Sequence, residues 1–340
     1  MLKIHKNLIF IPILAFVLIV TALILSFTIS LFLPGDPVLA YLPEGHINQE
    51  LYDAIRDQLG FNEPLIYFFM FPFKMLVGDW GRSLSIARGM PVLELILLKL
   101  PRTFDLLILP LAVGLVLGLF LGRVSVKSRS KIGSRFIQLP SLIAFAFPVF
   151  FIGMLFQFFL GYVFPIFPTT GFKSISFPDP PYITGSRVFD SLLSGQWYLI
   201  PDYISHLILP WISLTIPILS FTIIFVRMYH INQLNQSNDP EKRSIVPFMF
   251  YVGLGFGTIF AFLILDEITF GLAGFGQLFI DAFTNSDYWT ILGSIYFIFI
   301  TFVLVITISL LLFILYGHLK NRSIPKRQIV NQIDIEVNLS

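Results

Sequence analysis

Hydrophobic positions along this chain gather in long runs. A helix needs roughly 20 apolar residues to cross about 30 Å of hydrocarbon. Six runs approach or exceed this length, and they cover about residues 8–33, 106–122, 136–164, 203–226, 245–265 and 290–317. The pattern therefore predicts an all-α polytopic membrane protein with six transmembrane helices.

The first two runs need separate interpretation. No charged residue lies between Asn7 and Gly35, and this run far exceeds the roughly 7–15 apolar residues of a cleavable signal peptide, so we expect a retained and tilted first helix. The second run is short, yet Asp105 and Arg123 bracket it and a helical pattern from Pro91 leads into it. We expect both runs to cross the membrane.

Composition supports a lipid environment. Hydrophobic residues make up 56% of the 340 positions and charged residues 12%. The mean hydropathy is +0.84, which is more apolar than a soluble domain can bury. The chain contains no Cys, and nothing in its sequence indicates a disulfide framework, a zinc site or an iron–sulfur centre.

The distribution of charge predicts the topology. Most of the 22 basic residues fall in the N-terminus, in 123–135, in 227–244 and in the C-terminal tail, whereas most of the 20 acidic residues fall in the opposite connections. Lys and Arg avoid translocation across the membrane. We therefore expect a multi-pass protein of the plasma (inner) membrane with both termini in the cytoplasm.

The external connections differ in character. Residues 34–105 should contain a helix, because five apolar positions share one helical face before Gly60, and Pro64–Val77 should lie at the membrane interface. Residues 165–201 are rich in proline and should be irregular. The predicted organisation is a cytoplasmic N-terminus with helix 1 (1–33), an external helical segment (34–105), a permease core (106–317) and a cytoplasmic tail (318–340).

Two glycine patterns lie inside the predicted spans. Gly114, Gly118 and Gly122 repeat every four residues in the second span, and Gly253 and Gly257 do so in the fifth. Small residues at this spacing let helix backbones approach closely in lipid, where hydrophobic burial does not drive association. We predict that both patterns mark helix-packing surfaces rather than the lining of a pathway.

Several kinds of chemistry lack their motifs. The chain has no phosphate-binding G-x-x-x-x-G-K-[ST], no H-E-x-x-H and no G-x-S-x-G. The spans contain few ionisable residues, and the exceptions, Asp202 and His206, lie near the outer end of the fourth. Ion-coupled carriers usually need buried carboxylates or histidines. We therefore expect neither ATP hydrolysis by this chain nor coupling to an ion gradient, and we interpret Asp202 and His206 as polar groups at a helix start rather than as a proton relay.

Three groups of short stretches occur in a characteristic order and resemble the permeases of dipeptide and oligopeptide ABC importers, specifically the partner with a large first external segment. The first group is Leu33–Pro37, Gly78–Leu84 and Pro101–Leu106; the second is Ala146–Leu155 and Pro168–Phe172; the third is Asp266–Phe270, Gly274–Gly276, Asp281–Ala282 and Asp287–Tyr288. Together they extend over most of residues 30–290.

This resemblance implies a type I ABC importer permease fold. It also implies a second permease subunit, two cytoplasmic ATPase subunits and an external solute-binding protein as partners, with no cofactor in this chain and no nucleic acid. ATP would be used by the partner subunits. The candidate residues for external docking or gating are Asp79, Arg82, Glu267, Phe270 and Phe275.

One connection departs from the family. The expected cytoplasmic loop carries a Glu-Ala-Ala signature and a later Gly that form coupling helices, but the stretch from Arg227 to Ile245 is short and has neither. Asp239-Pro240-Glu241 instead predicts a helix start near 240. The remaining candidates for contact with an ATPase are Asn235, Ser237, Asp239, Glu241, Lys242 and Arg243.

Two explanations of the short loop stay open. Either the other permease supplies most of the coupling, or this chain is a degenerate permease-like scaffold or sensor that no longer couples. A polytopic membrane enzyme would need paired polar residues facing a cavity, and the sequence does not indicate any. The solute could be a peptide, a metal complex or an oligosaccharide.

Overall fold

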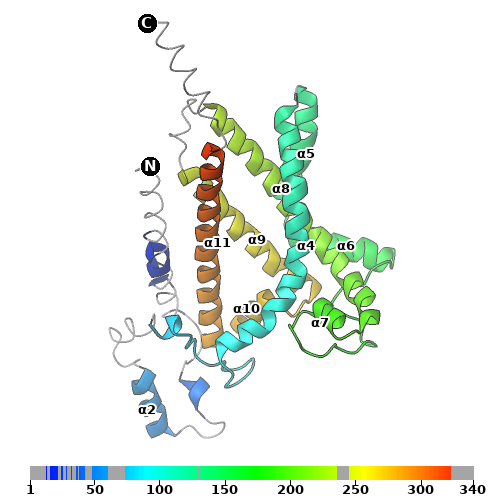
Figure 1. Cartoon of the computed structure of the whole chain (residues 1–340). Helices are drawn as coiled ribbons and strands as arrows, with labels where there is room; N and C mark the ends of the chain where they lie inside the picture. The colour runs from blue at the N-terminus through cyan, green and yellow to red at the C-terminus, as the bar shows by residue number, and fades with distance from the viewer. Residues whose placement is uncertain are drawn as a thin grey trace, which may run out of the picture.

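The computed structural model describes residues 16–21, 38–42, 48–59, 73–128, 130–235 and 245–322, together with a few other positions between 13 and 36. Within these ranges the regular elements are helices, apart from one antiparallel bridge between Arg82 and Pro91. In chain order they are η1 (Leu39–Tyr41), α2 (Gln49–Leu59), α4 (Val92–Lys127), α5 (Lys131–Ala146), α6 (Val149–Phe156), the π-helical η2 (Gln157–Val163), α7 (Arg187–Leu193), η3 (Trp197–Leu199), α8 (Ile200–Asn235), α9 (Ile245–Phe270), α10 (Phe275–Thr284) and α11 (Tyr288–Arg322) (Figure 1). The prediction of an all-α protein is confirmed for this part of the chain.

Among the described residues, four helices are long and apolar enough to cross a membrane: Val92–Lys127, Trp197–His230, Tyr251–Phe270 and Tyr288–Leu312. A fifth span results if the bent pair Ile132–Ala146 and Val149–Val163 is counted as one. The protein is therefore a multi-pass membrane protein. The first predicted span, 8–33, lies largely outside the described residues, so the number of six remains a prediction.

The third predicted span is not one straight helix. The run 136–164 was expected to cross in a single piece, but α5 and α6 meet at an angle of 92°. The break falls at Phe147, which is extended (φ −78°, ψ 132°), directly before Pro148. The proline ring disfavours helical backbone at the preceding residue and supplies no N–H to continue the hydrogen-bond ladder. Pro148 thus ends one helix and precedes the first turn of the next.

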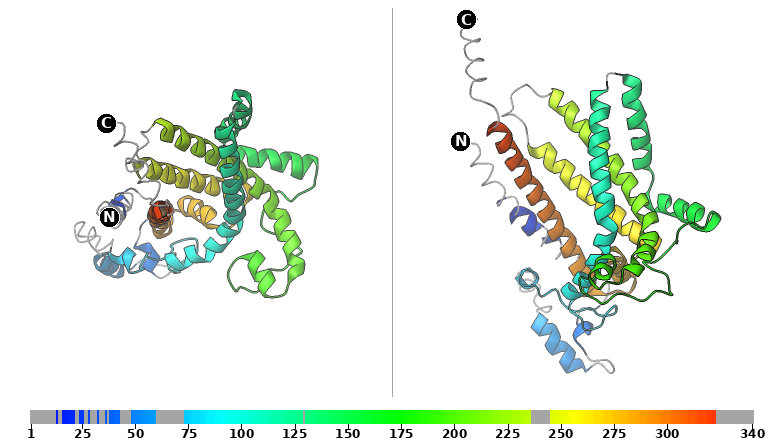
Figure 2. Two further views of the ribbon diagram at one scale, coloured as in Figure 1. Left: turned by 45° about the horizontal axis from the view of Figure 1, so that its top comes forward. Right: turned by 45° about the vertical axis from the view of Figure 1, so that its right-hand side comes forward.

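The central packing unit is formed by α4, α5 and α8, which contact one another, and α8 crosses α4 at an angle in both views of Figure 2. At each of three glycines of α4, an added Cβ would come within 3.0 Å of a side chain of α8. The pairs are Gly114 with Ile218, Gly118 with Thr222, and Gly122 with Val226. The α4 backbone therefore lies directly against α8 over the stretch from Gly114 to Gly122, which is about two helical turns, as expected for small residues in lipid.

The glycines of α9 behave differently. Gly253 lies at ordinary contact distance from Phe302 on α11, with 3.5 Å from its Cβ position to the ring. No atom among the described residues lies within 4 Å of the Cβ position at Gly257. The close approach in this helix occurs at Gly255, whose Cβ would lie 2.8 Å from the Phe221 ring. The pattern of α9 therefore does not form the continuous backbone contact that α4 makes.

The connections contain short ordered elements. Helix α2 lies where the spacing of apolar residues predicted a helix. Most of the predicted interfacial run Pro64–Val77 lies outside the described residues. Within 165–201 the chain is irregular up to Ser186, and then forms α7 and η3. Ser186 caps α7 by accepting a hydrogen bond from the Phe189 amide.

Candidate functional site

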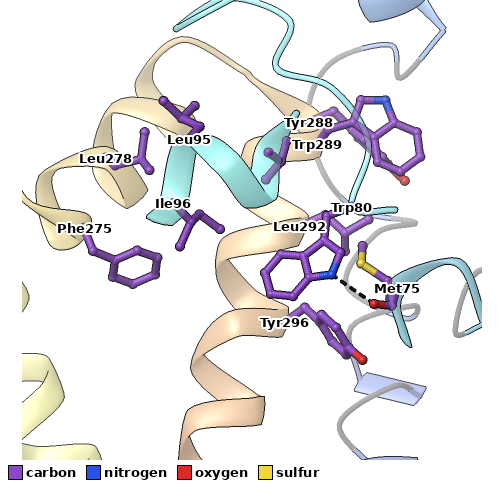
Figure 3. Packing of buried hydrophobic residues seen from close by; sticks show 11 residues of the cluster. Met75, Trp80, Leu95, Ile96, Phe275, Leu278, Tyr288, Trp289, Leu292 and Tyr296 are labelled. Atoms are coloured by element: carbon purple, nitrogen blue, oxygen red, sulfur yellow. Dashed lines mark hydrogen bonds between the residues drawn. The ribbon is translucent and has the colours of Figure 1, made fainter. Parts of the chain in front are cut away.

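One end of the helix bundle gathers most of the residues that the sequence singles out. Here the first turns of α4, the last turn of α9, all of α10, the first turns of α11 and the loop 79–91 meet. We call this region the acidic end, because Glu267, Asp281 and Asp287 all lie in it. Its interior is an apolar cluster of Met75, Trp80, Val92, Leu95, Ile96, Phe275, Leu278, Tyr288, Trp289, Leu292 and Tyr296 (Figure 3).

Trp80 ties the loop to this cluster. Its indole Nε1 donates to the Met75 carbonyl at 2.9 Å, and its ring meets that of Tyr296 edge-on with centroids 5.1 Å apart (Figure 3). Gly81 has a φ of +79°, and a Cβ there would lie 2.4 Å from the Trp289 ring. Only glycine satisfies both conditions without strain, so the loop turns directly against α11.

Glu267 is the polar centre of the acidic end. It is fully buried in the last turn of α9, and Thr103 Oγ1 of α4 donates to its Oε1 at 2.7 Å. The Gln277 amide of α10 donates to its Oε2 at 3.0 Å. Thr103 Oγ1 in turn accepts from the Phe275 amide at 2.7 Å, so one hydroxyl links all three helices. Because buried polar groups are costly without partners, this network fixes the relative positions of α4, α9 and α10.

The glycines near Glu267 make room for its carboxylate. A Cβ at Gly274 would lie 2.4 Å from Glu267 Oε1, and one at Gly276 would lie 3.0 Å from Oε2 and 2.8 Å from the Ile264 backbone. The turn between α9 and α10 therefore closes around the acid. Its neighbour Asp266 points to α8 instead, where Ser213 Oγ donates to Oδ1 at 2.6 Å.

Asp287 holds the loop 79–91 against the start of α11. Its Oδ2 accepts from Ser83 Oγ at 2.6 Å and from the amides of Ser85 at 3.0 Å and Ile86 at 3.2 Å, while Oδ1 accepts from the Thr290 amide at 3.3 Å. Burial alone would raise the pKa of this carboxyl, but the hydrogen bonds from Ser83 and the loop amides outweigh it and lower the pKa below its ordinary value. Asp287 is therefore ionised and bound by the loop.

The segment before α8 has a similar carboxylate centre. Asp190 accepts from the amides of Ile183, Thr184 and Gly185 and from Thr184 Oγ1. Burial opposes ionisation, yet these donors together lower the pKa of Asp190. Asp202 likewise accepts from the Ser174 hydroxyl at 2.6 Å and amide at 2.9 Å. Each carboxylate thus organises a turn of the irregular segment.

Asp202 and His206 also contact each other. The distance from His206 Nδ1 to Asp202 Oδ1 is 3.8 Å, and the same nitrogen lies 2.8 Å from the Asp202 carbonyl. Both side chains lie in the first turns of α8, where the sequence placed polar groups at a helix start. No further titratable residue among those described connects this pair to Glu267 by a hydrogen bond.

The structure distributes the five predicted docking or gating residues over two kinds of position. Glu267, Phe270 and Phe275 are buried, with exposures of 0%, 1% and 1%. Phe275 belongs to the apolar cluster of the acidic end, whereas Phe270 packs in a second cluster with leucines of α8. Arg82 and Asp79 belong to the loop, where Arg82 donates to the Gly89 carbonyl at 2.7 Å and Asp79 Oδ1 accepts from the Gly81 amide at 3.3 Å. Of the five predicted residues, therefore, Asp79 and Arg82 are exposed on the loop, and Phe270 and Phe275 are not accessible to a docking partner.

The predicted coupling residues cannot be placed in the same way. Asn235 is the last residue of α8, and the remaining candidates Ser237, Asp239, Glu241, Lys242 and Arg243 lie outside the described residues. At the same end of the bundle, Arg227 of α8 donates to Ser134 Oγ of α5 at 3.2 Å, and Gln138 Nε2 donates to Ser125 Oγ of α4 at 3.1 Å. The sequence analysis did not predict this polar contact between α4, α5 and α8. Ser and Gln side chains near the ends of apolar runs could have indicated it, because such groups need hydrogen-bond partners when they are buried.

The polar side chains of the acidic end hold segments of the chain together. Among the described residues, no group of three His, Asp or Glu side chains is arranged to hold a metal ion. The acids of the acidic end accept hydrogen bonds from fixed hydroxyls and amides, which is an arrangement for joining segments. Its chemistry is that of a structural junction at one end of a membrane bundle.

Comparison with known proteins adds a family context. No protein-family model matches the chain. A dipeptide transport system permease protein of Alkalihalophilus pseudofirmus is 28% identical over 319 residues, which is 88% of this chain and 93% of that protein. A probable D,D-dipeptide transport system permease protein of Escherichia coli is 26% identical over 301 residues (83% and 87%), and an oligopeptide transport system permease protein of Bacillus subtilis is 26% identical over 312 residues (86% and 91%). The chain is thus homologous along most of its length to permease proteins of dipeptide and oligopeptide transport systems, which confirms the resemblance found in its sequence.

Proposed function

We propose that this chain is a transmembrane permease subunit of an ABC importer, and that it forms half of the translocation pathway for peptides or similar small solutes delivered by a solute-binding protein. The observation that carries the proposal is similarity to peptide-system permeases over 83–88% of the chain. The apolar helices α4, α8, α9 and α11 support it, because they are long enough to line a route through the membrane. The relatives are named as permeases, not as enzymes.

The proposed topology has six helices, with helix 1 in residues 8–33 and with both termini in the cytoplasm. Basic residues support this orientation. Arg123 and Lys127 lie near the end of α4, Arg135 near the start of α5 and Arg227 near the end of α8, which places them at one end of the bundle. The acidic end lies opposite, and the positive-inside preference puts it outside the cell membrane.

The proposed assembly contains a second permease subunit, two cytoplasmic ATPase subunits and an external solute-binding protein, in the manner of a type I importer. ATP binds to those ATPases and no cofactor binds to this chain, which lacks a phosphate-binding loop motif. Contact with an ATPase would come from the short connection after α8, through Asn235, Ser237, Asp239, Glu241, Lys242 and Arg243.

The acidic end suits the external side of such a subunit. Glu267 and Thr103 join α4, α9 and α10, and Asp287 joins the loop 79–91 to α11. External segments are thereby attached to the helices that line the route. A protein that docks on the loop can then bias the positions of these helices, as alternating access requires.

A second candidate follows from the same short connection. Without the Glu-Ala-Ala signature, the chain can be a permease-like scaffold or sensor that does not couple to an ATPase. This alternative differs from the leading proposal in one measurable respect, which is whether the chain is found in a complex that hydrolyses ATP.

The deciding experiment is affinity purification of the chain in mild detergent, followed by identification of the co-purifying proteins and measurement of ATP hydrolysis with and without binding protein and peptide. A second permease, ATPases and stimulated hydrolysis support the importer. Recovery of the chain without any ATPase would overturn coupled transport and favour the scaffold.

A further inference from the structure

The charged residues around the first turns of α4 are unevenly paired. Helix α4 has 36 residues, or about 54 Å at 1.5 Å per residue, but its uncharged part from residue 106 to 122 accounts for only about 25 Å. Because the whole helix is longer than the roughly 30 Å of hydrocarbon, we expect the charged turns that precede residue 106 to lie at the edge of the hydrocarbon or beyond it. They carry Lys99 and Arg102, which we call the α4 cation pair.

The neighbouring carboxylates accept hydrogen bonds from other groups, and Asp105 Oδ2 has no hydrogen-bond partner among the described residues. Asp281 of α10 accepts from Gln277 Nε2 at 2.8 Å. Asp105 accepts from Ser186 Oγ at 2.5 Å, and Glu267 accepts from Thr103 and Gln277 as described above. These acids lie close enough to the cation pair to interact with it over a distance, but none forms an ion pair with Lys99 or Arg102 within the described part of the chain.

A third cation adds to the local positive charge. Arg187 of α7 repels both members of the pair, and its own partner is Asp179, at 2.8 Å. Asp179 is shared with Lys173 at 3.6 Å. Asp179 thus forms its ion pairs with two other cations, and it acts on Arg102 only over a distance.

Arg102 and Lys99 have few protein contacts of their own. The hydrogen bond of Arg102 runs from Nη1 to the Ala273 carbonyl and is long, at 3.5 Å. Lys99 makes no hydrogen bond or ion pair to another described residue. Both side chains are half-buried, so a loss of hydration is not balanced by protein partners. Two such cations three residues apart on one helical face are suited to bind a single anionic group.

We infer that the α4 cation pair binds the C-terminal carboxylate of a peptide as it enters the pathway. The inference rests on the proposed function and names the chemical group that is recognised. Peptides of different sequence share the terminal carboxylate, and an Arg guanidinium can bind it through two parallel hydrogen bonds while Lys adds a point charge. The position at the junction of α4, α7 and α10 is next to the acidic end, which the proposed topology places outside.

The test uses the complex that co-purifies with this chain, without the binding protein. Equilibrium dialysis compares radiolabelled dialanine with dialanine amide, which differ in the terminal carboxylate alone. The unmodified complex should bind dialanine more tightly than the amide. The double variant Lys99→Gln/Arg102→Gln should bind dialanine about tenfold more weakly, as expected from the loss of a charge-assisted hydrogen bond, and should leave binding of the amide unchanged.

Two further variants separate recognition from folding. Lys99→Arg/Arg102→Lys keeps both charges and should retain most of the preference for the acid. Arg56→Gln removes an external cation of α2 and should leave binding as it is in the unmodified complex. All variants must elute from size exclusion with the same partner subunits as the unmodified chain.

Three outcomes would overturn the inference: a preference for the acid that persists in the Gln double variant, an unmodified complex that does not distinguish acid from amide, or an equal loss of both ligands. The last result would mark the pair as structural or as part of a protein-docking surface. Failure of the proposed function is recognised separately, because it shows as a chain that is purified without ATPases.

Discussion

Substitution of Gly118 by alanine tests the α4–α8 contact most directly. An alanine Cβ would lie 2.5 Å from Thr222 Cβ, 2.8 Å from its Cγ2 and 3.1 Å from the Leu219 carbonyl oxygen. Thr222 cannot rotate away freely, because its β-branched side chain is restricted in a helix and its Oγ1 donates to the Ile218 carbonyl at 2.7 Å. The helices must therefore separate by about 1 Å to restore ordinary contact distances.

The expected cost of this separation is about 1–3 kcal/mol, the range found for overpacked interiors. The gain in helix propensity from Gly to Ala, about 1 kcal/mol, opposes it and must be subtracted. Gly257→Ala provides the matched control, since its Cβ would meet no described atom within 4 Å.

Both variants can be compared by unfolding the purified protein in mixed micelles with increasing SDS and following helicity by circular dichroism. Gly118→Ala should unfold at a lower SDS fraction than the unmodified protein, and Gly257→Ala at the same fraction or higher. If Gly118→Ala were as stable as Gly257→Ala, the close approach of α4 and α8 would be refuted.

Three further predictions concern the acidic end. Asp287→Asn should destabilise the protein by about 1–3 kcal/mol at neutral pH. Because the pKa of Asp287 is lowered in the folded state, its stabilisation is complete above about pH 4 and is lost as the pH falls through the folded-state pKa. The unfolding temperature of the variant should therefore depend less on pH on the acid side than that of the unmodified protein. Thr103→Val should cost about 1–3 kcal/mol in the same SDS titration, since it leaves Glu267 Oε1 without its hydroxyl donor, and an undiminished midpoint would exclude a role for this hydrogen bond. Trp80→Phe should lose about 1 kcal/mol through the missing bond to the Met75 carbonyl, and should make the external segment more sensitive to limited proteolysis, whereas unchanged cleavage would contradict the proposed anchoring.

Much of the fold was predictable because lipid imposes a simple rule on sequence. A helix that satisfies its own backbone in hydrocarbon must be long and apolar, and the runs 203–226, 245–265 and 290–317 correspond to α8, α9 and α11. The run 136–164 is equally apolar, yet the chain turns by 92° within it. Hydropathy does not reveal the break, because proline does not change the polarity of the run. Pro148 does indicate it, because a proline disfavours helical backbone at the residue before it, here Phe147.

The elements of the acidic end were predictable in part. The stretches around Asp266–Phe270 and Asp287–Tyr288 were recognisable by their order in the sequence. Their partners were not, since Ser83 and Asp287 lie 204 positions apart, and Thr103 and Glu267 lie 164 apart. The sequence alone does not predict which hydroxyl forms a hydrogen bond with a buried carboxylate so far away along the chain. Helix α10 was also missed, because its 10 residues are too few for a span.

The two ends of the bundle are joined through α4. This helix runs without interruption from Thr103, which is bonded to Glu267, to Ser125, which accepts from Gln138 of α5. Between these points three glycines hold it against α8, so α4 and α8 cannot slide independently without opening a backbone contact. We expect the part of α4 from Gly114 to Gly122 to move together with α8, because this close contact leaves little room for side-chain rearrangement, whereas Pro110 supplies no backbone N–H to the helix between Thr103 and Gly114.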